Sequence, residues 1–350
     1  ADIHGLGEVG IPNWGGAIVQ ALGQLAELVV GQDPFATEAL GQQMFRAGFF
    51  PADKVYACAI SAIDIALWDI KGKATGLPVY KLLGGPVRES VVCYPHVGGA
   101  TTEELIASCE AHIDAGWQFV RWHLPGEPVL EPREAVPACV EQIAAIREAA
   151  PDVGICLDVH TRLDMAHTMD LCRRLEPYGL YFIEDPLRSE NPGSYRALAR
   201  HVHVPIAAGE QWSSKWGFRE VIEEELIQYA RIDLCIVGGL TEALKVTHWS
   251  ETHYIDIVPH NPLGPVSAAA GVALCMASTN VGVQEMPRAP GSYATDLFPS
   301  QIEWEGGYAR CSDVPGLGVE LNETLAEERR APLNTWVPRV QRRDGAFSNW

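Results

Sequence analysis

Three carboxylates recur at a constant interval in the middle of the chain. Asp158 lies in CLDVH, Glu184 lies 26 residues later in YFIEDP, and Glu210 lies 26 residues later again in PIAAGEQ. Each closes a short apolar run and precedes a segment of helical length, which is typical of consecutive β/α units. Because neighbouring parallel strands end at the same edge, the three side chains are expected to meet there. Oxygen ligands of this kind suit Mg2+.

Each carboxylate taken alone has a simpler explanation. A single acidic residue after a strand is often a helix N-cap or a first-turn charge that the helix dipole stabilises. That explanation does not account for the repeated interval, so we favour a cation site formed by all three.

Two histidines follow strand ends in the same region. His260 ends the run VPH and Asp233 ends the preceding strand in RIDL, so the two are expected to be neighbours. A carboxylate that accepts a hydrogen bond from one imidazole nitrogen raises the basicity of the other, as a general base requires. His160 lies two residues after Asp158 and is expected to face the same side. A lone histidine is more often structural, but the adjacent carboxylates favour a catalytic site.

Four further residues are candidate substrate contacts. Glu285 closes the last predicted strand and could hydrogen-bond a substrate or pair with Arg288. Arg121 and His123 alternate onto one face of the second predicted strand, where either could bind a carboxylate. Trp14 lies in a loop rich in glycine, proline and asparagine.

The elements that would position these residues alternate between strand and helix from Ser90 onward. Eight short apolar runs predict the strands Val91–His96, Phe119–Leu124, Gly154–Asp158, Leu180–Glu184, Pro205–Glu210, Tyr229–Asp233, Ile255–His260 and Gly282–Glu285. Helical segments of about 10 to 15 residues separate them. This pattern predicts an α/β fold, a modified TIM barrel of the (β/α)7β type with no clear helix after the last strand.

The first part of the chain follows a different pattern. Residues 1–10 resemble the end of a strand that is incomplete at its start, and apolar spacing predicts helices over 17–30, 34–50 and 55–74. The third helix is apolar on most faces, so we expect it at a domain junction. We therefore predict a small α+β domain over 1–89, the barrel over 90–300, and a C-terminal segment over 301–350 that returns to the small domain.

The composition narrows the choice of partners. The 350 residues are 47% hydrophobic, which is enough for a large barrel and a smaller domain, and their formal net charge is −19. This charge argues against nucleic acid and against an anionic membrane surface as binding partners.

Nine scattered cysteines without a CxxC pair predict buried free thiols. Neither a leader nor a bilayer-spanning apolar run is evident, so we expect a soluble cytoplasmic protein.

Two sets of motifs together resemble a known family. The first part of the chain contains SAIDIALWDIKGK and LLGG, and the barrel contains DVH, FIEDP, PIAAGE, IVGGLTE, PHNPLGP and QE. In this order they resemble the enolase superfamily, in its mandelate racemase subgroup, and most closely its sugar-acid dehydratases of the D-galactonate dehydratase type. The resemblance covers nearly the whole chain.

The resemblance implies a role for each candidate. The implied ligands of an essential Mg2+ are Asp158, Glu184 and Glu210. The implied base dyad is His260 with Asp233, the implied acid is His160, and Glu285 is a further site residue. An α+β capping domain would close two loops, around 11–16 and 45–53, over the barrel and read a carboxylate sugar. The implied reaction is dehydration of an aldonate such as D-galactonate, D-gluconate or D-mannonate to a 2-keto-3-deoxy acid through an enediolate. Homo-oligomers, octamers among them, are common in this family.

One departure from the family pattern affects the choice of reaction. Many relatives carry lysine at the end of the second strand, whereas this chain has Arg121, Trp122 and His123. Arginine is a poor proton acceptor, which weakens a racemase that uses two bases. An epimerase or cycloisomerase that uses the same enediolate but expels no water is the alternative, favoured if His123 is a second base and His160 lies too far from any C3 hydroxyl. Outside enzymes, the alternative is a catalytically weak regulatory protein that binds metal or a sugar acid.

Overall fold

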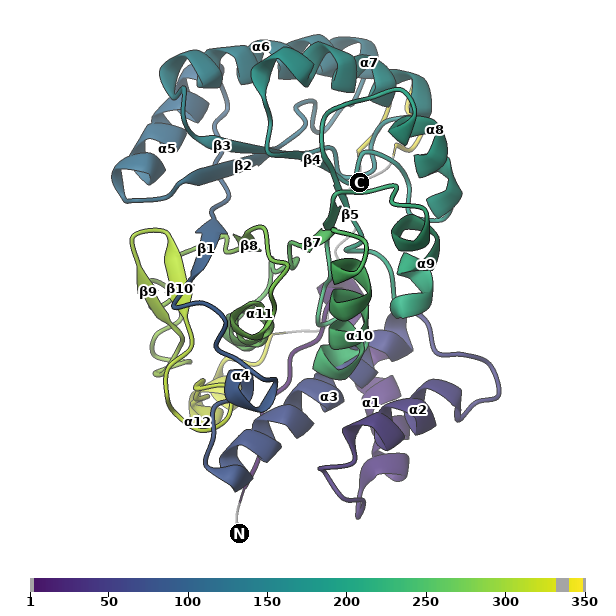
Figure 1. Cartoon of the computed structure of the whole chain (residues 1–350), viewed down its shortest axis with the longest axis vertical. Helices are drawn as coiled ribbons and strands as arrows, with labels where there is room; N and C mark the ends of the chain where they lie inside the picture. Colours follow the sequence, from purple (N-terminus) through teal and green to yellow (C-terminus); the bar gives the residue numbers. More distant parts are fainter. Residues whose placement is uncertain (1–2, 332–339, 349–350) are drawn as a thin grey trace.

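The computed structural model describes residues 3–331 and 340–348, which form a small helical lobe beside a barrel of parallel strands (Figure 1). The elements of the lobe are η1 (Pro12–Trp14), α1 (Gly15–Val29), α2 (Thr37–Arg46), α3 (Lys54–Thr75) and α4 (Val79–Leu82). The three predicted helices are confirmed as α1, α2 and α3, with ends that differ by a few residues.

Residues 3–10 contain no strand, so the prediction of a strand end there is wrong. They run along α3 instead, where a Cβ on Gly5 would lie 2.0 Å from the carbonyl oxygen of Ala66. The missing side chain therefore permits a backbone approach that other residues would block. The Leu6 N–H donates to the Asp69 carboxylate at 2.9 Å. A hydrogen bond to a side chain of α3, and not pairing with another strand, therefore holds this segment.

Eight parallel strands close into the predicted barrel. They are β1 (Val91–Tyr94), β2 (Phe119–His123), β3 (Gly154–Asp158), β4 (Phe182–Glu184), β5 (Ile206–Ala208), β6 (Tyr229–Ala230), β7 (Asp256–Ile257) and β8 (Gln284–Glu285). Strands β2 to β7 form one parallel sheet, and β1 pairs with β8. Single bridges from His96 to Arg121 and from Ile257 to Val281 complete the ring.

Helices follow each of the first seven strands, in agreement with the predicted (β/α)7β order. They are α5 (Thr102–Asp114), α6 (Pro132–Ala149), α7 (Met165–Leu175), α8 (Tyr195–Ala199), α9 (Lys215–Glu223), α10 (Gly239–Glu251) and α11 (Pro265–Ala277), with the short turns η2 (Glu176–Tyr178) and η3 (Pro192–Ser194). Asp158 at the end of β3 pairs in register with Glu184 at the end of β4. The strand ends therefore bring the predicted chemistry to one edge of the barrel.

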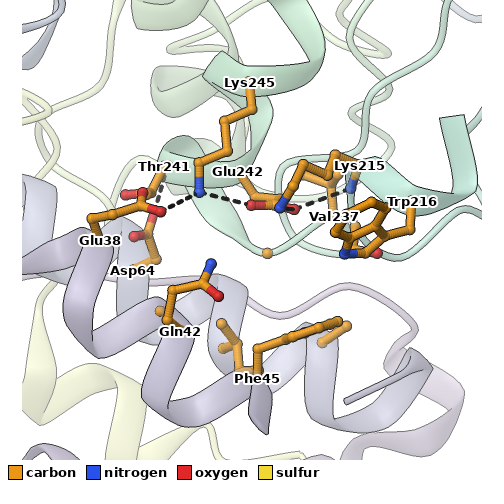
Figure 2. Close-up of a pocket in the computed structure, with 15 residues that line it drawn as sticks. Glu38, Gln42, Phe45, Asp64, Lys215, Trp216, Val237, Thr241, Glu242 and Lys245 are labelled. Atoms are coloured by element: carbon orange, nitrogen blue, oxygen red, sulfur yellow. Dashed lines mark hydrogen bonds and ion pairs between the residues drawn. The ribbon is translucent and has the colours of Figure 1, made fainter. Parts of the chain in front are cut away.

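Helix α3 lies at the junction between the lobe and the barrel, as predicted. The Thr241 N–H at the start of α10 donates to Asp64 of α3 at 2.9 Å, and ion pairs cross the same junction (Figure 2). Lys245 of α10 lies 2.7 Å from Glu38 of α2 and 3.0 Å from Glu242. The cavity among these residues is about 40 Å³, room for roughly two or three waters.

After the barrel come β9 (Glu303–Glu305), β10 (Tyr308–Arg310) and α12 (Glu323–Glu328). Strand β10 pairs antiparallel with β1. The Leu317 N–H donates to Asp69 of α3 at 2.8 Å. Residues 340–348 lie against the barrel instead, where the Leu130 N–H donates to the Gln341 carbonyl at 2.9 Å. The C-terminal segment therefore contacts both parts, and the domain boundaries stay predictions.

The cysteines are free thiols, as predicted. Eight of the nine are buried, and Cys311 is partly exposed. Burial raises the pKa of the Cys109 thiol to about 12, which keeps it in the unreactive protonated form. Across the residues that the structure describes, every helix is too short or too polar to cross a membrane.

Candidate active site at the mouth of the barrel

The three predicted carboxylates lie at or just after the carboxyl ends of three neighbouring strands. Asp158 ends β3, Glu184 ends β4, and Glu210 follows β5 by two residues. Glu184 and Glu210 place oxygens within 4.8 Å of one another, in a group that also includes Asp185. Asp158 belongs to a second group, with His123 and His160, and Asp185 is an unpredicted neighbour of Glu184 and Glu210.

Gly209 lets the chain turn so that Glu210 enters the mouth. Its φ is +137°, and a Cβ there would lie 2.5 Å from the ring of Phe218. Both the backbone conformation and the lack of space exclude a side chain at this position. The glycine in PIAAGE is thus required by the placement of the carboxylate after it.

Arg121, a predicted substrate contact, is buried among the carboxylates. Its guanidinium bonds Asp158 and lies 3.4 Å from Glu184, and its Nη1 donates to His123 Nε2 at 2.9 Å. Burial disfavours a charge on Asp158, but Arg121 outweighs that effect and holds the pKa of Asp158 well below its usual value. Arg121 therefore stabilises a charged carboxylate at the end of β3.

Arg231 is an unpredicted member of the site. It is fully buried, contacts Glu184, and lies 2.9 Å from Glu285 and 3.3 Å from Glu210. Burial raises the pKa of Glu184 to about 8, although Arg231 opposes the shift. A sequence signal was available, because Arg231 precedes Asp233 by two residues and alternation puts both on one face of a strand.

His260 and Asp233 form the predicted pair. His260 Nδ1 lies 2.6 Å from Asp233, whose other oxygen accepts from the Cys235 N–H at 2.7 Å. His260 Nε2 lies 3.4 Å from Glu210. Burial disfavours protonation, but the carboxylates of Glu210, Glu285 and Asp233 outweigh it and raise the pKa of His260 to about 9. Without a cation this imidazole therefore holds a proton at neutral pH, and a cation that compensated the Glu210 charge would lower its pKa and free Nε2 to act as a base.

His160 and His260 each approach a different oxygen of Glu210. His160 Nε2 is 3.9 Å from Glu210 Oε1, whereas His260 Nε2 is nearest Oε2. The His160 N–H donates to Asp158 at 2.7 Å, which fixes the backbone at a φ of +56°. Burial lowers the pKa of His160, although Asp158 and Glu210 oppose the shift. The two imidazoles thus differ, because without a cation His260 holds its proton more tightly than His160 does.

Both ring nitrogens of His123 are occupied. Nδ1 lies 3.0 Å from Asp158, and Nε2 accepts from Arg121. In this tautomer Nδ1 carries the proton and Nε2 has used its lone pair. The arrangement argues against His123 as a second base.

Glu285, another predicted substrate contact, is fully buried at the end of β8. One of its oxygens lies 2.6 Å from His96 Nε2, and the other accepts from the Asn261 N–H at 2.8 Å. His96 is an unpredicted residue that lines the cavity over the mouth. Burial lowers the pKa of His96 to about 4, so the neutral imidazole predominates at neutral pH.

A cavity of about 660 Å³ opens over the mouth. From the barrel it is lined by residues that include His96, Arg121, His123, His160, Glu210, Asp233 and His260. From the small lobe, the predicted Trp14 and the unpredicted Lys54 line it. Lys54 Nζ bonds the backbone carbonyl of Gln211, one residue after Glu210. Both parts of the chain therefore enclose the cavity.

The mouth holds more buried carboxyl groups than its arginines can pair with. Its buried carboxylates are those of Asp158, Glu184, Asp185, Glu210, Asp233 and Glu285. The buried arginines that contact this group are Arg121 and Arg231. Among the residues that the structure describes, Glu184 Oε2 and Asp185 Oδ2 have no hydrogen-bond partner. Unpaired buried oxygens of this kind fit a divalent cation that prefers oxygen ligands.

Comparisons with known proteins agree with this geometry. The protein-family model described as "Enolase C-terminal domain-like" matches residues 104–325. The family model of the "Mandelate racemase / muconate lactonizing enzyme, N-terminal domain" matches residues 2–84. D-galactonate dehydratase from Ralstonia pickettii is 36% identical over 97% of this chain and 94% of that protein.

Two solved structures share the fold over most of their length. The first is an enolase from Pantoea ananatis with bound D-gluconate and Mg, with a TM-score of 0.89 and 29% identity over 95% of this chain and 89% of that one. The second is a putative galactarate dehydratase from Agrobacterium radiobacter with bound Na and L-malate. Its TM-score is 0.90, with 27% identity over 99% of this chain and 92% of that one.

Proposed function

This chain belongs to the mandelate racemase / muconate lactonizing enzyme family of the enolase superfamily and is a dehydratase, and we propose that it removes water from an aldonate of the D-galactonate type. The substrate class is supported by the D-galactonate dehydratases that resemble the whole chain and by the related structure that holds D-gluconate. The product would be a 2-keto-3-deoxy acid.

The proposed cofactor is Mg2+, held by Asp158, Glu184 and Glu210. When bound, the cation supplies positive charge beside the substrate carboxylate, which makes the C2 proton acidic enough for an imidazole base. The unpaired oxygen of Glu184 and the excess of buried carboxylates support this assignment.

The observation that carries the proposal is the pair of imidazoles that approach different oxygens of Glu210. His260 Nε2 takes the C2 proton, because Asp233 occupies Nδ1. His160 donates a proton to the C3 hydroxyl, which leaves as water. Loss of H from C2 and OH from C3 gives an enol, which tautomerises to the 2-keto-3-deoxy acid. An epimerase or cycloisomerase with His123 as second base fits less well, since both nitrogens of His123 are occupied.

The test is a screen of the purified protein with Mg2+ against aldonates of four to six carbons, with semicarbazide to detect 2-keto-3-deoxy products. We expect turnover of an aldonate that EDTA abolishes. In His260→Asn, kcat should fall about 10²- to 10⁴-fold, the usual contribution of a general base. His201→Asn, which changes an exposed histidine outside the site, is the matched control and should retain full activity.

Two results would contradict the proposal in different ways. Exchange of the C2 proton with D2O without any keto acid would show a competent base with another outcome, and would favour the epimerase or cycloisomerase. If the protein neither exchanges nor dehydrates any acid of the library, the dehydratase proposal fails for this substrate class.

A further inference from the structure

Asp185 points into the mouth, although its place in the sequence suggests the opposite. Successive side chains of a regular strand point to opposite faces, so the residue after Glu184 is expected to face away. The φ of Asp185 is +38°, however, in the left-handed region. As a result its carboxylate joins Glu184 and Glu210 in one group, with oxygens within 4.8 Å of one another.

The Asp185 carboxylate is buried and poorly compensated. The residue is 4% exposed, and one oxygen accepts the Gly209 N–H at 3.4 Å. Among the described residues, the other oxygen has no hydrogen-bond partner. Arg121 and Arg231 form ion pairs with the neighbouring carboxylates, and across the described part of the chain none is found to Asp185.

The main chain fixes Asp185 without help from its charge. The Thr161 N–H donates to the Asp185 carbonyl at 2.8 Å, and the Asp185 N–H donates to the Ala207 carbonyl at 2.9 Å. These bonds join the segment after β4 to the segment after β3 and to strand β5. An asparagine could accept the Gly209 N–H equally well, and burying an unpaired charge is costly. A carboxyl group rather than an amide at this position therefore calls for a function other than holding the fold.

We propose that Asp185 is a fourth carboxylate of the cation site, which adds negative charge to the site formed by Asp158, Glu184 and Glu210. The inference rests on the proposed function for the presence of a divalent cation at the mouth. It explains why a buried oxygen without a partner lies beside two candidate ligands. An ion that neutralises Glu184 and Glu210 would also relieve their repulsion of Asp185.

The test is Asp185→Asn, which keeps the shape and removes the charge. EDTA-treated protein is titrated with Mg2+ and with Mn2+ by calorimetry, and Tm is measured with and without each ion. We expect the Kd to rise about 10- to 100-fold, as for other groups that support a metal site. The Tm without cation should equal or exceed that of the wild type, because asparagine keeps the bond to the Gly209 N–H and cannot become a buried charge. A merely structural residue would instead lower Tm in both solutions.

Asp64→Asn is the matched control, because Asp64 is an equally buried carboxylate at the junction with α10, outside the mouth. It should leave the Kd for Mg2+ unchanged. Asp185→Ser, smaller and uncharged but still able to accept the Gly209 N–H, replaces the asparagine variant if that fails to fold. Wild-type affinity in the uncharged variant overturns the inference and leaves the proposed dehydratase standing. A wild-type protein that binds neither ion overturns both.

Discussion

At the scale of single residues, Arg231 supplies a permanent positive charge to the mouth, since it contacts Glu184 and lies 2.9 Å from Glu285. Arg231→Met would leave these buried carboxylates short of a counter-charge, and breaking a buried ion pair costs about 3 to 5 kcal/mol. We expect this loss of unfolding free energy in EDTA. The loss should be smaller with Mg2+, because the cation would compensate Glu184. Urea denaturation in the two solutions measures the difference.

Arg196→Met is the control for that experiment. Arg196 is an exposed arginine paired with Glu224, so its loss should change stability little in either solution. If Arg231→Met lost the same free energy with and without Mg2+, the arginine and the cation would not share their carboxylates.

Residue types and spacing predicted those side chains that end a strand and face inward. Asp158, Glu184, His260 and Asp233 all lie where alternation and strand order put them. Asp185 escaped prediction because its positive φ reverses the expected direction. The sequence predicted His96 only as the last residue of a strand, and it lies beyond the end of β1. Its hydrogen bond to Glu285 depends on the pairing of β1 with β8.

At the scale of elements, the barrel was predictable because each β/α unit repeats one pattern of apolar residues. Apart from β3, the hydrogen-bonded strands are shorter than predicted: β6 and β7 each have two residues, and Asp233 and His260 are joined by a single bridge beyond them. The prediction of a strand end over 1–10 was wrong for a different reason. Glycines allow residues 3–10 to lie against α3 instead.

The junction between α3 and α10 makes stability depend on pH through Asp64. Burial raises the pKa of Asp64 to about 7, despite the hydrogen bond from Thr241 and the charges of Lys71 and Lys245. The folded protein therefore binds this proton more tightly than the unfolded chain, whose Asp pKa is near 3.8. The contribution of Asp64 to stability is complete below about pH 4 and is lost as pH rises through 7.

Asp64→Asn removes that dependence and keeps an oxygen for the Thr241 N–H (Figure 2). Relative to wild type, the variant should gain up to about 4 kcal/mol between pH 4.5 and pH 8. Urea denaturation at the two pH values measures this gain. Asp170→Asn, at an ion-paired and half-exposed position on α7, should show no comparable gain. A gain of zero for Asp64→Asn would mean that the carboxylate stays charged in the folded protein.

At the scale of the whole molecule, an acidic protein has to bind an anionic substrate. The net charge of −19 repels a carboxylate at a distance, so positive charge has to be supplied locally. The small lobe contributes Lys54, which lines the cavity and is half exposed there. Its ammonium bonds the Gln211 carbonyl, and the adjacent Asp53 bonds Ser213 of the barrel. Lys54 is thus placed both to hold the lobe against the barrel and to attract the substrate.

Lys54→Gln separates these two contributions, because glutamine can still donate to the Gln211 carbonyl but carries no charge. We expect KM for the aldonate to rise about tenfold, the equivalent of one hydrogen bond to a charged group, while kcat changes little. The difference in KM should shrink as salt screens the attraction. Lys54→Arg should retain a low KM, and Lys215→Met, which removes a lysine paired with Glu242 at the junction, should leave KM unchanged. A fall in kcat at constant KM would instead place Lys54 in the chemical step. If neither constant changed in Lys54→Gln, only groups of the barrel would attract the substrate.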